Sequence, residues 1–268
     1  MANKTPTVYT NARLKEYPTK YVMQVANKAI FPYAPGAALP RPYAVPPPGE
    51  AKDPEKAKEE SQRRAKARVR DIALCNCFEY FFTFTISPHL LNRYDPKTIY
   101  QKVRNFLANA VKRKGFAYVL VPEYHKLKKG ETSPGIHMHG LCKLGKVRIE
   151  RATSKKGLPL FDRHNRPIYN MLDWKWGFST CVPIDQQYER TVNYITKYIT
   201  KNTSKIFGKW YLASRNVIKF PTTIPLDPVL YDEHRDIEKI SQHIQIENEI
   251  CKGLKLITEE YPVINNTN

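Results

Sequence analysis

The sequence has no long apolar run, few cysteines and a shortage of acidic side chains. No stretch approaches the about 20 apolar residues that cross a bilayer as a helix, so we expect no membrane-spanning segment. The first 20 residues lack the apolar centre of a secretory signal. The five cysteines are an odd number, which argues against a disulfide framework and favours a reducing compartment. We therefore predict a cytoplasmic protein.

The shortage of acidic side chains leaves a large positive charge. Lys and Arg total 44 against 25 Asp and Glu, which gives a formal net charge of +19. Such an excess favours a polyanionic partner, and 17 Tyr and 11 Phe are available to stack on bases, so nucleic acid is the leading candidate. A basic protein on a membrane surface is the alternative. It is less favoured because the basic residues are spread along the chain and do not border one apolar stripe.

Three regions of the chain differ in composition. Residues 1–52 show little periodicity and contain the proline-dense YAPGAALPRPYAVPPPGE, so we predict an extended Pro-rich arm. Residues 53–221 carry the regular patterns of a folded core, which begins with a basic helix that Asp53 can cap. Residues 222–268 are predicted to form a C-terminal helical tail. The apolar side of that helix would consist of Ile237, Ile240, Ile244, Ile250 and Leu254.

Hydrophobic patterning within the core predicts alternating strands and helices. Residues 78–87 alternate apolar and hydroxyl side chains, as in a strand with one buried face. The next helix begins at its N-cap Asp95 and ends at Gly115. Two strands follow, in residues 116–125 and 135–144. This order predicts an α+β fold with a central antiparallel sheet, helices packed on it, and the split βαβ connection of ferredoxin-like and RRM-like domains.

The segment HMHGLCKLGK, residues 137–146, contains a near match to a phosphate-binding loop. Gly140, Gly145 and Lys146 have the required spacing, but Val147 stands where a Ser or Thr hydroxyl would contact Mg²⁺. The first glycine also lies within a predicted strand, whereas such a loop joins a strand to a helix. We therefore predict no ATP-driven activity for this segment.

The same segment contains two histidines at strand spacing. Residues i and i+2 of a strand share a face, so His137 and His139 would point to the same side. Glu123 and His125 alternate in the same way on the preceding strand. One carboxylate with two imidazoles suits Mg²⁺ or Mn²⁺, and His125 is the alternative to Glu123 as third ligand. The simpler interpretation of an H-x-H pattern alone is two structural histidines.

The segment YITKYITK, residues 194–201, is a repeat of four residues. On a helix, Tyr194, Lys197, Tyr198 and Lys201 lie along one stripe. The simpler interpretation is an amphipathic helix with half-buried tyrosines, and its β-branched residues also allow a strand. The pairing of phenol with ammonium groups also fits a tyrosine nucleophile. A phenol with a pKa of about 10 needs assistance to attack phosphorus at neutral pH.

Together, FFTFTIS, HMHGL and YITKYITK resemble the three motifs of the HUH endonucleases, in the same order. The chain is most similar to the two-tyrosine type, the rolling-circle replication initiators of phages and plasmids. VPEYH, residues 121–125, resembles the strand that supplies the third metal ligand of that family. The resemblance covers the chain from Arg63 to Pro221, and leaves out the Pro-rich arm and the C-terminal helix.

This resemblance implies a metal-dependent DNA endonuclease and strand transferase. His137, His139 and Glu123 would hold one Mg²⁺ or Mn²⁺ that polarises the scissile phosphodiester of single-stranded DNA at a replication origin. One tyrosine would form a 5′-phosphotyrosine, the other would serve a second strand transfer, and the lysines would stabilise negative charge. Host helicase and polymerase are the expected protein partners, in the cytoplasm of a bacterial host. The residues implied in catalysis are Tyr194, Tyr198, Lys197 and Lys201.

Two alternatives stay open at this point. One is a relaxase or a single-tyrosine transposase with the same metal site, although a doubled tyrosine favours replication. The other is a non-catalytic RRM-like domain that stacks bases on aromatic strand residues. Its stacking residues would be Phe82, Phe84 and Tyr118. A second aromatic group would either stack on unpaired bases or cover the end of the sheet, and consists of Tyr169, Trp174 and Trp176.

Overall fold

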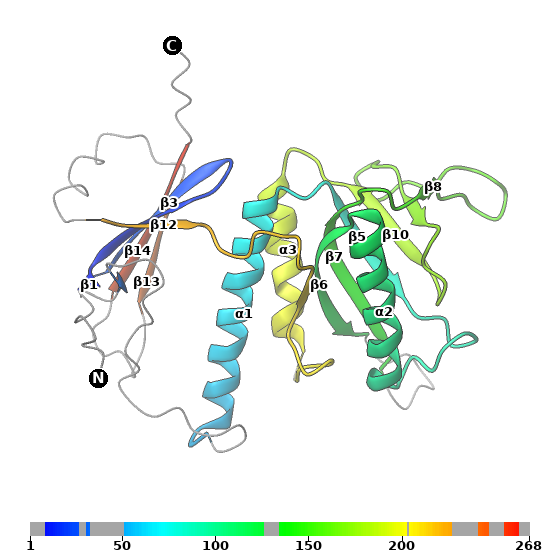
Figure 1. Cartoon of the computed structure of the whole chain (residues 1–268), viewed down its shortest axis with the longest axis horizontal. Coiled ribbons are helices and arrows are strands. Elements are labelled where there is room, and N and C mark those ends of the chain that lie inside the picture. Colours follow the sequence, from blue (N-terminus) through cyan, green and yellow to red (C-terminus); the bar gives the residue numbers. More distant parts are fainter. Residues whose placement is uncertain are drawn as a thin grey trace, which may run out of the picture. The chain divides into compact units, whose positions relative to one another are not determined.

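The computed structural model describes most of the chain, and the described residues fall into two compact units. One unit spans Asp53–Lys219, and the other combines residues before and after it. Figure 1 shows the helices and strands of each unit. None of the helices in the described part of the chain combines the length and apolar character needed to cross a membrane. The described residues are 9–26, 31–32, 51–125, 134–202, 204–226, 241–246 and 255–262.

The unit Asp53–Lys219 contains a seven-stranded sheet in which every recorded pairing is antiparallel, in the order β11-β6-β7-β5-β10-β9-β8. Strand β7 lies between β5 and β6 and is antiparallel to both, so β5, helix α2 and β6 form a split βαβ unit. The predicted antiparallel sheet with packed helices is confirmed. The strands are β5 (Tyr80–Thr85), β6 (Ala117–Tyr124), β7 (Ile136–Lys143), β8 (Ile149–Arg151), β9 (Tyr169–Met171), β10 (Ser179–Pro183) and β11 (Leu212–Ala213).

Three residues predicted to cap helices lie at helix ends in this unit. The Asp53 carboxylate accepts from the Lys56 amide at 3.0 Å, and the Asp95 carboxylate accepts from the Lys97 amide at 3.0 Å. Gly115 ends its helix in the left-handed conformation, with φ of 68°. The predicted caps are therefore confirmed. The helices are α1 (Pro54–Asn76), α2 (Pro96–Lys114) and α3 (Tyr188–Lys201).

The two faces of the sheet pack against different helices (Figure 1). Alternating residues such as Phe82, Phe84 and Met138 pack under α2, while Val121 and Leu141 pack under α1 and α3. Because side chains alternate along a strand, the odd-numbered residues of β5, β6 and β7 lie on the face of α1 and α3. This is the face that carries His137 and His139.

Burial removes most of the aromatic residues proposed to stack on bases from the solvent. Phe82 and Phe84 are fully buried, and Tyr118 is 8% exposed, so they do not form an open stacking platform. Trp174 is also buried, and its ring stacks on Phe84 with 4.2 Å between centroids. The alternative in which Phe82, Phe84 and Tyr118 stack on bases is therefore wrong. The reason is that α2 covers this face of the sheet and needs large apolar partners. In the second aromatic group Trp174 packs in the core, while Tyr169 and Trp176 stay partly exposed.

Gly140 allows the close packing of Phe82 on the sheet. A Cβ atom at this position would lie 2.2 Å from the Phe82 ring and 2.8 Å from the Val119 carbonyl oxygen. We expect Gly140→Ala to lower the free energy of unfolding by about 1–3 kcal/mol, the usual cost of overpacking. Urea denaturation measures this difference. Gly135→Ala is the matched control, because the atoms nearest to its Cβ would belong to the flexible Arg93 side chain, and an equal loss in both variants would contradict the packing argument.

The second unit corrects two predictions about the ends of the chain. Most described residues of the predicted N-terminal arm form strands, and its proline-dense segment lies outside the described residues. The predicted C-terminal helix is wrong for residues 241–246 and 255–260, which are also strands. In the five-stranded sheet the order is β12-β2-β3-β14-β13, and β1 pairs with β4. The strands are β1 (Tyr9–Thr10), β2 (Ala12–Glu16), β3 (Lys20–Ala26), β4 (Phe31–Pro32), β12 (Thr222–Leu226), β13 (Ser241–Ile246) and β14 (Lys255–Pro262).

The physical reason for both corrections is long-range pairing. Strand β14 pairs with β3, more than 200 residues earlier in the chain, and the buried Lys20 ammonium donates to Glu260 at 2.7 Å. The isoleucine spacing of the C-terminal segment fits an amphipathic helix, but β-branched residues also favour strands once a partner is present. The periodicity of a segment carries no information about a partner strand that is distant in the sequence.

Candidate active site

The predicted metal ligands lie on adjacent strands of one sheet face. Glu123 of β6 is the direct partner of His137 of β7 in the strand register, and Thr83 of β5 is the partner of His139. Residues 126–133 of the connection between β6 and β7 lie outside the described residues. The strand pairing therefore brings a carboxylate, a hydroxyl and two imidazoles to one area under α3.

His139 has a polar partner for each ring nitrogen. Its Nε2 atom lies 2.9 Å from Glu123 Oε2, and its Nδ1 atom lies 3.1 Å from Thr83 Oγ1. With Glu123 ionised, Nε2 donates and Nδ1 accepts from the Thr83 hydroxyl. Thr83 therefore orients the ring. The sequence shows Thr83 only as one hydroxyl of an alternating strand, because its position opposite His139 depends on strand pairing.

The second histidine and its neighbour form a separate contact. The His137 ring lies 4.6 Å from the His125 ring and 6.4 Å from the His139 ring, measured between centroids. Burial, followed by the nearby His125 and His139, lowers the pKa of His137 to about 4. His137 is therefore a neutral imidazole at neutral pH, which is the form that binds a metal.

The donor chemistry of this area fits a divalent ion in part. Two ligands bound to one octahedral ion at about 2.1 Å lie about 3 Å apart, which matches the 2.9 Å between Glu123 Oε2 and His139 Nε2. However, no group of three or more His, Cys, Asp or Glu side chains within the described residues is arranged as a metal site. Two of the three predicted donors thus converge, while His137 contacts His125.

The tyrosine repeat lies on α3, above the same sheet face. The Tyr198 ring stacks on the His139 ring, with 4.0 Å between centroids and 10° between planes. Tyr198 is 4% exposed and Tyr194 is 43% exposed. The Tyr198 hydroxyl donates to the Tyr194 oxygen at 2.5 Å. Burial and this hydrogen bond raise the pKa of Tyr198 well above its usual range, so Tyr198 keeps its proton.

The two predicted lysines differ in their surroundings. Lys201 donates from Nζ to Glu123 Oε1 at 3.1 Å and lies over the Tyr198 ring. Lys197 is exposed and has no ion pair among the described residues. Burial raises the pKa of Glu123, but hydrogen bonds from His139 and Lys201 outweigh it, so the net pKa is lowered. The Glu123 carboxylate is therefore ionised at neutral pH.

Buried amides hold the end of α3 on the sheet. The Asn202 side chain donates to the Pro122 carbonyl at 2.8 Å and accepts from the Tyr124 amide at 3.3 Å. The Gln62 amide of α1 donates to the carbonyls of Ile199 and Asn202. These contacts keep α3 in place beside Glu123. The sequence offers no local signal for them, because the partners come from three separate elements.

The comparison with protein families concerns this same part of the chain. Residues 79–203, less than half of the chain, match a family model described as Replication-associated protein ORF2. The matched segment begins just before β5 and ends just after α3, so it contains both histidines, Glu123 and both tyrosines. Comparisons with curated proteins and with solved structures give no match. Over residues 79–203 the chain is therefore similar to replication-associated proteins of the ORF2 family.

Proposed function

We propose that this protein is a two-tyrosine replication initiator of the HUH type. It would nick and rejoin single-stranded DNA at an origin and so start rolling-circle replication of a phage or plasmid. The observation that carries the proposal is the position of the tyrosine pair directly on the histidine–carboxylate pair of the sheet. Tyr198 stacks on His139, and Lys201 contacts Glu123. The family match over residues 79–203 supports a role in replication.

Tyr194 is the better placed of the two nucleophiles. The Tyr194 side chain is exposed, whereas the Tyr198 side chain is buried against the His139 ring. The Tyr198 hydroxyl donates to the Tyr194 oxygen, and this bond would stabilise negative charge on the attacking atom. Tyr198 would serve the second strand transfer, after Tyr194 has become bound to DNA.

The reaction exchanges one phosphodiester for another. A bond forms between the Tyr194 oxygen and the scissile phosphorus, while the bond from phosphorus to the 3′ oxygen breaks. The phenolic proton leaves to solvent, and the departing 3′ oxygen takes up a proton to become the 3′-OH that primes synthesis. The phosphotyrosine keeps a phosphodiester bond, so rejoining the strand would need no ATP.

Mg²⁺ or Mn²⁺ would be held by Glu123 and His139 with His137 as the third ligand. When bound, the ion supplies a Lewis acid for a non-bridging phosphate oxygen. Lys201 is placed to balance charge beside Glu123, and we assign no contact to Lys197. The net charge of +19 would add phosphate contacts that carry no sequence information. Host helicase and polymerase in a bacterial cytoplasm are the partners that this role requires.

A cleavage assay on labelled single-stranded oligonucleotides tests this proposal. We expect a covalent protein–DNA adduct in the presence of Mn²⁺, no adduct in EDTA, and no adduct when both Tyr194 and Tyr198 are replaced by Phe. Tyr100→Phe, on α2 at the other face of the sheet, is the control and should cut normally. If a wide panel of candidate origins binds tightly but is never cut, the protein is a binding domain and the proposal is wrong.

A further inference from the structure

We propose that a pocket beside Tyr194 binds one nucleotide of the single-stranded DNA substrate, next to the phosphate that is cut. This inference rests on the proposed function and adds a specificity site to it. The pocket has a volume of about 590 Å³ and lies between β10, the start of α3 and the turn at residues 162–166. This volume is within the about 300–1,000 Å³ of pockets that take small ligands.

The pocket has an apolar floor suited to a base. Phe81 and Tyr194 line it, with 5.7 Å between their ring centroids. The side chains of Ile168 and the buried Val182 complete this apolar surface. Stacking of an unpaired base on such a surface contributes about 1–3 kcal/mol and tolerates any base. Because Tyr194 is part of the wall, a nucleotide bound here would place a neighbouring phosphate at its hydroxyl.

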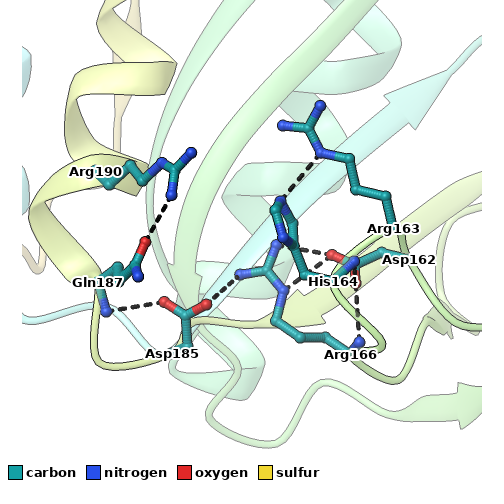
Figure 2. Close-up of polar contacts among 7 residues, drawn as sticks. All are labelled: Asp162, Arg163, His164, Arg166, Asp185, Gln187 and Arg190. Carbon is teal, nitrogen blue, oxygen red and sulfur yellow. Dashed lines mark hydrogen bonds and ion pairs between the residues drawn. The ribbon is translucent and has the colours of Figure 1, made fainter.

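Arg166 holds the pocket together and is not itself a ligand. Its guanidinium donates to Asp162 Oδ2 at 2.9 Å and 2.7 Å and to Asp185 Oδ2 at 3.3 Å (Figure 2). These bonds join the 162–166 turn to the loop before α3. Two carboxylates neutralise Arg166, and the hydrogen bonds from Arg166 outweigh burial and lower the pKa of Asp162. Arg166 is therefore a positioning residue.

Arg163 and Arg190 carry the charge that is available to a phosphate. Both are exposed, and neither has an ion pair within the part of the chain that the structure describes. Arg163 donates to His164 Nε2 at 3.0 Å, and Arg190 donates to Gln187 Oε1 at 2.9 Å (Figure 2). Neither partner is a carboxylate, so no acidic side chain among these contacts offsets the charge of either guanidinium. Arginine is the side chain best suited to bind phosphate oxygens in pairs.

The rim of the pocket also offers groups that can distinguish bases. The Gln187 amide, at the start of α3, makes no capping hydrogen bond with its side chain, and Thr180 is an exposed hydroxyl on β10. Amide and hydroxyl groups can donate to or accept from a base edge. An apolar floor, a neutral polar rim and two arginines are the parts of a nucleotide site, and they adjoin the proposed nucleophile.

The test compares two variants that lose the same charge. Arg163→Gln with Arg190→Gln should weaken binding of a labelled oligothymidylate by about 10-fold, because two phosphate contacts are lost. Lys155→Gln with Lys156→Gln, two exposed positions outside the pocket, should change binding by less than about 3-fold. Fluorescence anisotropy measures both, and thermal melting confirms that both variants fold. An equal loss of oligothymidylate affinity in the two variants would show that the pocket is not a nucleotide site.

An abasic scan separates this inference from the proposed function. In the oligonucleotide that the wild type cuts, loss of one base beside the cut should slow cleavage by about 10-fold, and loss of more distant bases should not. If every abasic position slows cleavage equally, the proposed nucleotide site is wrong, but the proposed nuclease activity is still supported. If no oligonucleotide is cut but the arginine variant still loses binding, the proposed function is wrong, the placement beside a cut phosphate falls with it, and the pocket remains only as a binding site for single-stranded DNA.

Discussion

Tyr194→Phe is expected to abolish the covalent protein–DNA adduct, whereas Tyr198→Phe should keep it and form it more slowly. Tyr194 is exposed, while Tyr198 is buried against His139 and donates a hydrogen bond to the Tyr194 oxygen. A hydrogen bond to a charged group contributes about 1.5–3 kcal/mol, so Tyr198→Phe should slow the first cut by about 10–100-fold. It should also prevent the second transfer, because the second nucleophile is then missing.

Mass spectrometry of the digested adduct identifies the tyrosine that carries the DNA. In the wild type and in Tyr198→Phe, the nucleotide should be found on Tyr194. Single-turnover kinetics with a suicide oligonucleotide measure the rate of the first cut separately from rejoining. The opposite result, an adduct only in Tyr194→Phe, would assign the first attack to Tyr198 and would mean that α3 moves before the cut.

Glu123→Gln and His139→Ala should each reduce Mn²⁺ affinity and nicking by at least about 100-fold. Loss of a group that merely supports a ligand costs about 10–100-fold, and loss of a ligand itself should cost more. Glu123 and His139 are the two donors that already lie 2.9 Å apart. His125→Gln should cost less than either ligand variant, about 10-fold, because the His125 ring contacts His137 and its loss is that of a supporting group.

Isothermal titration with Mn²⁺ measures these affinities without any DNA. Thr83→Val is a second comparison, because it removes the hydroxyl at His139 Nδ1 and leaves all three proposed donors in place. We expect Thr83→Val to lower the Mn²⁺ affinity less than Glu123→Gln does. If His125→Gln loses as much affinity as Glu123→Gln, the third ligand is His125 and the proposed ligand set is wrong.

The local elements of the core could be predicted because their signals are local. The caps Asp53 and Asp95 and the stop at Gly115 each act within one turn of a helix. The alternation in residues 78–87 marks β5 for the same reason, since side chains on a strand alternate between faces. The described residues at the two ends of the chain were predicted wrongly, because β3 and β14 pair with each other across more than 200 residues.

The sequence by itself determined which side chains share a face. The spacing of His137 and His139 places them on one side of β7, and the repeat of four residues places Tyr194 and Tyr198 on one side of α3. These relations depend only on the periods of a strand and a helix. They identify the candidate groups without showing what those groups contact.

Only the tertiary structure decided how these faces meet. Strand pairing set Thr83 beside His139, and the packing of α3 on β6 set Tyr198 on the same ring and Lys201 on Glu123. The same packing buried Tyr198 and left Tyr194 exposed, and the pocket with Arg163 and Arg190 formed where the start of α3, β10 and the 162–166 turn meet. These contacts join segments that are far apart in the chain, and burial and partner identity arise only when those segments pack together.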